Sequence, residues 1–105
     1  MAQFTVYRNK NARSKAVFPL LVDVQSDLLE DLQTRVVIPL SKAAALTRKP
    51  VSQLTPVIEF EDSSYVLVTP QLAGIARSEL GIPTGSVAQS RDVILAAMDF
   101  LLLGF

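Results

Sequence analysis

Apolar positions along the chain fall into short runs separated by polar segments or by segments containing glycine and proline, a pattern typical of β-strands. The runs that predict strands are residues 4–7, 17–24, 35–40, 57–60 and 65–69. Polar residues 8–15 follow the first run, and Asp62-Ser63-Ser64 lies between the last two. Because these residues favour turns, the last two strands are predicted to form a hairpin.

The remaining segments before residue 86 give weaker patterns. Ser41 followed by three alanines predicts a short helix over 41–46, which would end before Pro50. Residues 71–80, with a glycine inside, predict a bent strand or a bulge. Residues 26–33 mix acids with leucines and fit neither periodicity. The next segment contains glycine and proline at alternate positions, and is expected to interrupt regular structure at Gly81, Pro83 and Gly85.

A C-terminal helix is the most informative predicted element. Ser86 and Gln89 have capping-box spacing and predict a helix over 87–102. From Val93 onward only Asp99 is charged, which leaves more apolar surface than a helix on one side of a small barrel can bury. Two interpretations remain open, a helix embedded in its own core and a helix shared with a second copy or a target. The fold class is therefore mostly β with a C-terminal α-helix, arranged as a small β-barrel.

Length and composition indicate one domain with excess apolar surface that a partner is expected to cover. The 105 residues predict a single domain over 1–105. Half of the residues are apolar and only 19% are charged, against a usual charged share of about 25%. Since a homodimer is the commonest way to cover excess apolar surface, a homodimeric protein is expected. Its interface is expected on the apolar helix, at Ile94, Met98 and Leu101.

Charge argues against a nucleic-acid binder but leaves room for a charged protein partner. Ten basic and ten acidic residues give zero net charge, whereas nucleic-acid binding requires a basic surface. Direct sequence-specific binding of nucleic acid is therefore not expected. The basic residues nevertheless cluster, since Arg8, Lys10, Arg13 and Lys15 lie within eight positions. Such a group is either a solvated loop or a contact for an acidic segment.

The chain lacks the residues that most hydrolytic and metal sites use. It contains neither histidine nor cysteine, which excludes Ser–His–Asp and Cys–His catalysis and the usual zinc ligands. No catalytic residue, metal or cofactor is predicted. The absence of cysteine fits a reducing cytoplasm. No signal peptide is visible, and the longest apolar stretch, 93–105, is shorter than the ~20 residues that span a bilayer. A cytoplasmic protein without membrane contact is expected.

Two acids and an arginine keep a catalytic alternative open. Asp23 and Asp27 lie four apart, where they can chelate a divalent ion, act as acid and base, or simply form a structural turn or ion pair. Arg35 can offset one of these acids or steady a phosphate. Because arginine with a carboxylate is sufficient in principle for RNA cleavage, a ribonuclease remains an alternative.

Four stretches of the chain are distinctive when they are taken together. They are Gln3-Phe4-Thr5-Val6-Tyr7, Leu21-Val22-Asp23-Val24-Gln25-Ser26-Asp27, Arg35-Val36-Val37-Ile38-Pro39-Leu40 and Leu103-Gly104-Phe105. At this spacing they resemble the CcdB family of toxins. The resemblance implies a homodimeric, SH3-like small β-barrel of the CcdB, MazF and Kid type. It implies a toxin that binds the DNA gyrase A subunit, traps the gyrase–DNA cleavage complex and is neutralised by a CcdA-like antitoxin with a disordered tail. The alternatives are a MazF/Kid-like endoribonuclease toxin and a protein that only binds its antitoxin.

The resemblance also implies which residues contact each partner. It assigns the gyrase contact to a loop pair, to helix positions and to the C-terminal tip, which are Leu28, Leu29, Ala96, Asp99, Leu101, Leu102, Leu103, Gly104 and Phe105. It assigns the antitoxin contact to Arg8, Asn9, Lys10 and Arg13. The chain departs from the family at the tip, where Leu103 and Phe105 replace a tryptophan and an isoleucine. Leucine buries apolar area but offers no ring for a cation–π contact.

Overall fold

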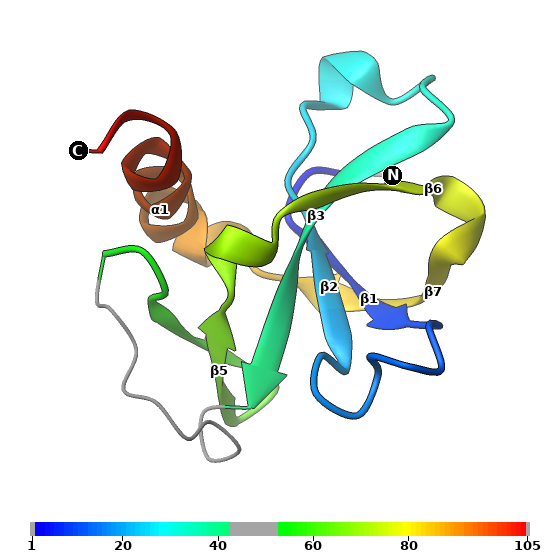
Figure 1. Cartoon of the computed structure of the whole chain (residues 1–105), viewed down its shortest axis with the longest axis horizontal. Helices are drawn as coiled ribbons and strands as arrows, with labels where there is room; N and C mark the ends of the chain where they lie inside the picture. Colours follow the sequence, from blue (N-terminus) through cyan, green and yellow to red (C-terminus); the bar gives the residue numbers. More distant parts are fainter. Residues whose placement is uncertain (1, 43–52, 105) are drawn as a thin grey trace.

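The structure is a computed structural model that describes residues 2–42 and 53–104. Its strands are β1 (Thr5–Asn9), β2 (Leu20–Asp23), β3 (Thr34–Lys42), β4 (Val57–Phe60), β5 (Ser63–Leu67), β6 (Ala73–Ala76) and β7 (Leu80–Ser86). Short 3-10 helices are η1 (Asp27–Leu29), η3 (Thr69–Gln71), η4 (Arg77–Glu79) and η5 (Ala88–Ser90). The C-terminal helix α1 (Arg91–Leu103) follows η5 (Figure 1).

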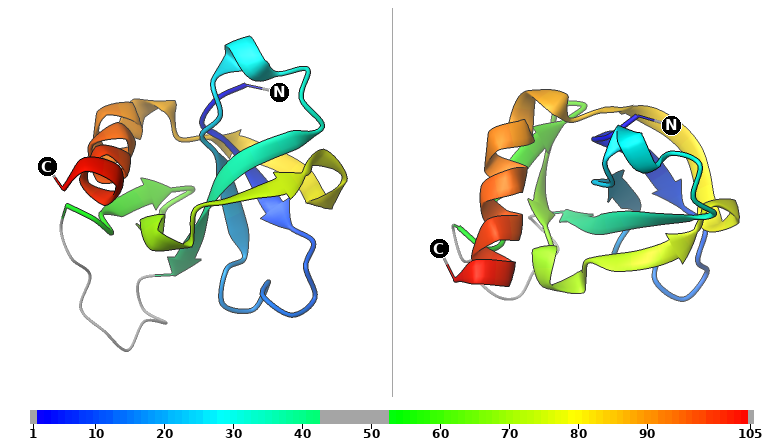
Figure 2. Two further views of the ribbon diagram at one scale, coloured as in Figure 1. Left: turned by 45° about the horizontal axis from the view of Figure 1, so that its top comes forward. Right: turned by 90° about the horizontal axis from the view of Figure 1, so that it is seen from above.

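The strands form one curved antiparallel sheet in the order β4-β5-β3-β2-β1-β7. The long strand β3 pairs with β2 along one edge, and at its other edge with β6 near its start and β5 near its end. The sheet curls round, and α1 lies across one open side, as the view from above shows (Figure 2). The fold is thus a mostly antiparallel β half-barrel with one C-terminal helix, which confirms the predicted fold class.

Strand alternation sends side chains into two separate apolar clusters, one on each face of the sheet. Val6, Val22 and Ile38 are matched across β1, β2 and β3, and all three are fully buried. They belong to the larger cluster, which α1 completes. The neighbouring positions on the same strands point to the opposite face, where Tyr7 and Leu21 join a smaller cluster. Both faces of the central strands are therefore covered, which explains their nearly continuous apolar sequence.

Strand β7 corrects the expectation that regular structure breaks at Gly81, Pro83 and Gly85, because all three lie within this strand. A Cβ at Gly81 would lie 2.6 Å from the carbonyl oxygen of Arg8, so glycine permits the close pairing of β7 with β1. Pro83 is tolerated because β7 is the last strand in the sheet order and needs only one hydrogen-bonded edge.

Other predicted boundaries also change. The helix begins at Arg91 rather than 87, because Ser86 accepts a hydrogen bond from the Ala88 amide at 3.1 Å and η5 intervenes. Ser41 and Lys42 continue strand β3, so the predicted helix over 41–46 is wrong there, and its remainder lies outside the described residues. The hairpin is confirmed, although its turn residues are Glu61 and Asp62, both with positive φ. Residues 71–80 form η3, β6 and η4, a bent course rather than one strand.

Candidate functional site

Helix α1 has a buried side and an apolar exposed side. Ile94 and Ala97 are fully buried in the core cluster. Leu102 and Leu103 retain 71% and 62% of their accessible surface. The helix ends at Gly104, which has φ 81° and donates its amide to the Phe100 carbonyl at 3.0 Å. One face of the helix is therefore embedded in the chain's own core, and for the exposed face the interpretation of a helix shared with a partner stays a prediction.

The helix residues that were expected to contact gyrase or a second copy differ in how exposed they are. Ala96, Asp99 and Leu101 are exposed, while Met98 is half-buried and packs against the core cluster. Ile94 lies wholly inside the chain's own core, where a second copy does not reach it, so the dimer surface proposed below is built without it. Phe105 lies outside the described residues.

Sequence reasoning missed part of the outward face of α1. Val93 is exposed and Phe100 is half-buried. Together with Ala96 and Leu103 they form the series 93, 96, 100 and 103, with intervals of three, four and three residues. Residues so spaced lie on one face of a helix. This spacing is visible in the sequence, but the face that meets the sheet was not known, so the outward stripe was not distinguished from the core.

The two leucines of the expected gyrase loop form the exposed turn η1. Leu28 keeps 94% of its accessible surface, and Leu29 is also exposed. Ser26 caps the turn, because its hydroxyl accepts a hydrogen bond from the Leu28 amide at 3.2 Å. The side-chain amide of Gln25 donates to the Leu29 carbonyl at 2.8 Å. Polar side chains thus hold the backbone of a turn whose leucines remain free.

This turn is also tied to the N-terminus and to β3. The Asp27 carboxylate accepts the Gln3 amide at 2.7 Å, and the Gln3 side chain donates to the Val24 carbonyl at 3.1 Å. The Gln25 side-chain oxygen accepts the Val36 amide at 3.1 Å. Three of the stretches that carry the family resemblance, at 3–7, 21–27 and 35–40, are therefore joined by hydrogen bonds at one place.

The same network contains a buried ion pair. Arg35 donates from Nε to Oδ2 of Asp23 at 2.9 Å, its Nη2 lies 2.7 Å from the same oxygen, and both side chains are fully buried. The other oxygen, Oδ1, accepts the Gln25 amide at 3.0 Å. Burial raises the pKa of the nearby Tyr7 hydroxyl above its ordinary value, and the Asp23 charge raises it further. Arg35 is therefore enclosed with its acid, as one of the sequence interpretations expected, and is not placed to steady a phosphate.

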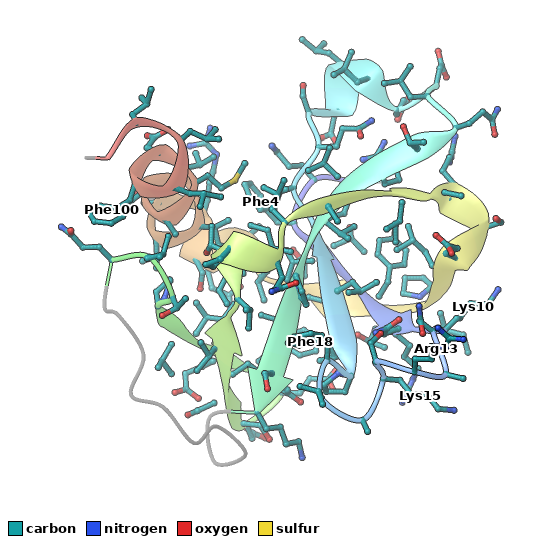
Figure 3. All side chains as sticks on the ribbon, in the orientation of Figure 1. Phe4, Lys10, Arg13, Lys15, Phe18 and Phe100 are labelled. Carbon is teal, nitrogen blue, oxygen red and sulfur yellow. The ribbon has the colours of Figure 1, made fainter. Side chains whose placement is uncertain are left out.

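The basic loop between β1 and β2 carries exposed charges on an internally hydrogen-bonded backbone. Arg8, Lys10 and Arg13 are exposed, and the side chains of Lys10, Arg13 and Lys15 extend from one end of the molecule (Figure 3). Asn9 differs, because its half-buried amide donates to the Ser14 hydroxyl at 2.9 Å and the Phe18 carbonyl at 2.8 Å. Asn9 therefore holds the loop in shape while its charged neighbours face outward.

The candidate surfaces occupy different parts of a single chain. Phe100 on α1 and the charged side chains of the basic loop lie at opposite ends of the molecule (Figure 3). The turn η1 stands apart from both α1 and the basic loop in the three ribbon views (Figures 1 and 2). One partner bound to the basic loop alone would thus leave the end of α1 uncovered.

The described residues offer little for catalysis. Within residues 2–42 and 53–104, no group of three potential ligands is placed to hold a metal ion. No helix in that part of the chain is long and apolar enough to cross a membrane. Exposed apolar side chains on a half-barrel whose Asp23–Arg35 pair is fully buried are typical of a class of protein that acts by binding another macromolecule.

Comparison with known protein families agrees with that class. Residues 3–104 match the family described as CcdB protein. The chain therefore belongs to the CcdB family, whose members are toxins of CcdA/CcdB modules and act as non-enzymatic poisons of DNA gyrase. The resemblance seen in the sequence is confirmed over nearly the whole chain, and the endoribonuclease alternative is not supported.

Proposed function

We propose that this toxin binds the A subunit of DNA gyrase through two apolar patches and so traps the enzyme on cleaved DNA. The first patch is the end of α1, with Ala96, Asp99, Leu101, Leu102 and Leu103 followed by Gly104 and Phe105. The second is η1, with Leu28 and Leu29. The observation that carries the proposal is the exposure of three large leucines, Leu28, Leu102 and Leu103, that a lone domain has little reason to display.

The experiment that tests this function incubates the purified protein with gyrase and plasmid DNA, and in parallel with bare RNA. Cleaved plasmid is expected to accumulate after protein denaturation, while the RNA stays intact. Gyrase carrying a substitution on its A subunit that abolishes toxin binding would serve as the control. Cleaved RNA together with unaffected gyrase would replace this proposal with the ribonuclease alternative. An effect on neither would leave a protein that only binds its antitoxin.

A homodimer is the second part of the proposal. Met98 is half-buried and packs against the core cluster, and Leu101, three residues further along α1, is exposed, so apolar contact with a second copy at these residues would extend the core cluster. Dimerisation also offers a way to combine η1 and the α1 tip into a larger surface, because the two patches lie apart within one chain (Figure 2). Specific protein–protein interfaces bury about 800 Å² per partner, which favours a surface built from more than one patch.

The dimer is tested by light scattering at micromolar concentration. We expect twice the 11.4 kDa mass of the chain. Leu101→Asp is expected to halve the observed mass because it places a charge in an apolar contact. Val93→Asp, at an exposed position near the other end of α1, is the matched control and should remain dimeric. Monomeric wild-type protein at this concentration would contradict the proposal.

The basic loop is proposed as the antitoxin contact, with Arg8, Lys10 and Arg13 as the contacting residues and Asn9 as the residue that shapes the loop. An antitoxin tail carrying acidic and apolar residues would fold as it binds there. The proposal is supported by the exposure of these cations and by the absence of an acid within 4.0 Å of them among the described residues. Gyrase and the antitoxin would meet the toxin in the cytoplasm.

A further inference from the structure

A pocket of about 460 Å³ opens beside the basic loop on the face of the sheet opposite α1. Its floor is apolar, with Leu21 on β2 and Val37 and Pro39 on β3. Ala73 and Ile75 of β6 form one wall, and the loop between β1 and β2 forms the other. Pockets of this size with an apolar floor and a few polar groups at the rim are typical of sites for a bound side chain or small molecule.

The loop wall of the pocket is preformed. Besides the bonds that Asn9 donates, its side-chain oxygen accepts the Asn11 amide at 2.9 Å, and the Asn11 side chain accepts the Arg13 amide at 2.8 Å. The Phe18 side chain, also at the pocket, is half-buried. Because the backbone here is held by its own side chains, a ligand would not need to order this wall, which lowers the entropic cost of binding.

One lysine joins the two walls. The ammonium group of Lys10 crosses from the loop to η4 and donates to the Ser78 carbonyl at 3.0 Å, an exposed bond. Lys10 and Ser78 both line the pocket, as does Glu79 beside them. A neutral carbonyl is a weaker acceptor for an ammonium group than a carboxylate is. A ligand carboxylate at the loop side of the rim, away from Glu79, would therefore compete for Lys10.

Charge selects the kind of ligand that reaches this pocket. Arg8 near the end of β1 and Arg13 and Lys15 on the following loop add to the charge of Lys10. All four are exposed, and none has an acid within 4.0 Å among the described residues. The A-subunit contact is proposed at α1 and η1, which lie away from this loop (Figure 3). The surface thus combines an apolar cavity with a loop side that is positively charged, opposite the single acid Glu79 of the lining, and the loop side favours an acidic segment carrying an apolar side chain.

We infer that this pocket receives one large apolar side chain of the antitoxin tail, and that a carboxylate of the same tail replaces the Ser78 carbonyl as the partner of Lys10. The inference rests on the proposed function, in which the antitoxin binds at the basic loop. It adds a defined anchor to what is otherwise a diffuse charge contact. A buried anchor of this kind controls the dissociation rate, whereas the surrounding charges act mainly on association.

Filling the pocket is the first arm of the test. Ala73→Phe on β6 places a ring where the antitoxin side chain would sit, and Ala76→Phe, exposed on the same strand but outside the pocket lining, is the matched control. Binding of the full-length CcdA-family antitoxin from the same module is measured by surface plasmon resonance. Ala73→Phe is expected to raise the dissociation rate about tenfold or more, the effect of losing one buried anchor. Ala76→Phe is expected to leave it unchanged.

Removing the lysine charge is the second arm. Lys10→Met keeps most of the side-chain length without the ammonium group, and Lys15→Met makes the same charge change on the same loop outside the pocket lining. Both variants should slow association equally at low salt. Only Lys10→Met is expected to speed dissociation, by about tenfold, and that effect should persist at high salt because the bound tail would cover the contact. Equal dissociation rates for the two variants would show that Lys10 contributes no more than the other cations of the loop, and would overturn the inference.

The remaining outcomes separate the pocket from the proposed function. Triple reversal of Arg8, Lys10 and Arg13 to glutamate should slow antitoxin association at low salt, and an unchanged rate contradicts the basic-loop site itself. If the triple variant is slowed but Ala73→Phe binds like wild type, only the pocket is refuted. If Ala73→Phe instead changes the oligomeric mass, the pocket belongs to a contact between copies, which also refutes the inference. Gyrase poisoning by Ala73→Phe should equal that of wild type, and a melting curve verifies folding.

Discussion

Deleting Leu103, Gly104 and Phe105 is expected to abolish gyrase poisoning while the protein still folds and binds its antitoxin. Leu103 is mostly exposed, and the deletion removes the hydrogen bond that Gly104 donates to the Phe100 carbonyl at the end of α1. Losing one exposed helix-end bond costs about 1 kcal/mol, equivalent to about 4–8 °C in melting temperature for a domain of this size. In the proposed dimer the deletion would remove apolar anchors from both copies, which should raise the poisoning dose about 100-fold or more.

The assay compares gyrase-mediated DNA cleavage by full-length and truncated protein, beside a melting curve and an antitoxin titration for each. Leu103→Trp is the complementary variant. A ring at this exposed position can stack on a cation of gyrase, which is worth about 0.5–2 kcal/mol per site, so a lower poisoning dose is expected. Ile82→Trp, at an exposed apolar position of β7 outside both proposed patches, is its control. A truncated protein that poisons at the full-length dose would show that the toxic contact lies elsewhere, and one that fails to fold would make these residues structural.

The strands that could be predicted are those whose local sequence and tertiary environment agree. Residues 35–40 form most of β3 because β-branched side chains suit a strand buried on both faces. The hairpin of β4 and β5 follows from alternating residues on either side of a polar turn. Leu28 and Leu29 could not be assigned to an element, since η1 is held by Gln25 and Ser26 side chains and not by any periodic pattern.

The features that could not be predicted depend on pairing between distant segments. Gly81 and Pro83 have low strand propensity, yet the close approach of the Arg8 backbone and the edge position of β7 make them suitable there. The pocket has walls from the β1–β2 loop, β6 and η4, which are brought together only by strand register. The sequence indicated an apolar helix but left open whether it is embedded in its own core or shared with a partner, and did not show which face is core. The predicted dimer interface therefore included Ile94, whereas the structure buries this residue in the chain's own core and leaves Leu102 and Leu103 exposed.

The ion pair of Asp23 and Arg35 illustrates the same limit, because the two residues lie twelve positions apart and meet through the pairing of β2 with β3. Sequence reasoning identified both residues but left open a metal site, catalysis, a phosphate contact and a structural pair. The register matches Asp23 with Val37, two residues beyond Arg35 on the same face of β3. Arg35 is therefore brought beside Asp23 within the sheet, and the pair is closed off from solvent.

Replacing one member of this pair is expected to be among the most destabilising changes in the protein. Arg35→Met preserves the length of the side chain but leaves the Asp23 carboxylate buried with only the Gln25 amide as a partner. Breaking a buried pair in this way costs about 3–5 kcal/mol. Since a domain of this kind is stable by about 5–15 kcal/mol, much of the population would unfold under mild denaturant. Urea denaturation at one fixed protein concentration measures the loss, because the proposed dimer would make stability concentration-dependent.

The double variant Asp23→Asn/Arg35→Met supplies the decisive comparison. The asparagine oxygen can still accept the Gln25 amide, and no buried charge remains, so the double variant should recover most of the stability lost in Arg35→Met. Because Gln25 also anchors Leu29 and Val36, the double variant should keep η1 in place and still poison gyrase. If Arg35→Met changes the free energy of unfolding by less than about 1 kcal/mol, the pair does not hold this part of the sheet. If the double variant is stable but no longer poisons gyrase, the charges themselves serve the toxic function beyond shaping the turn.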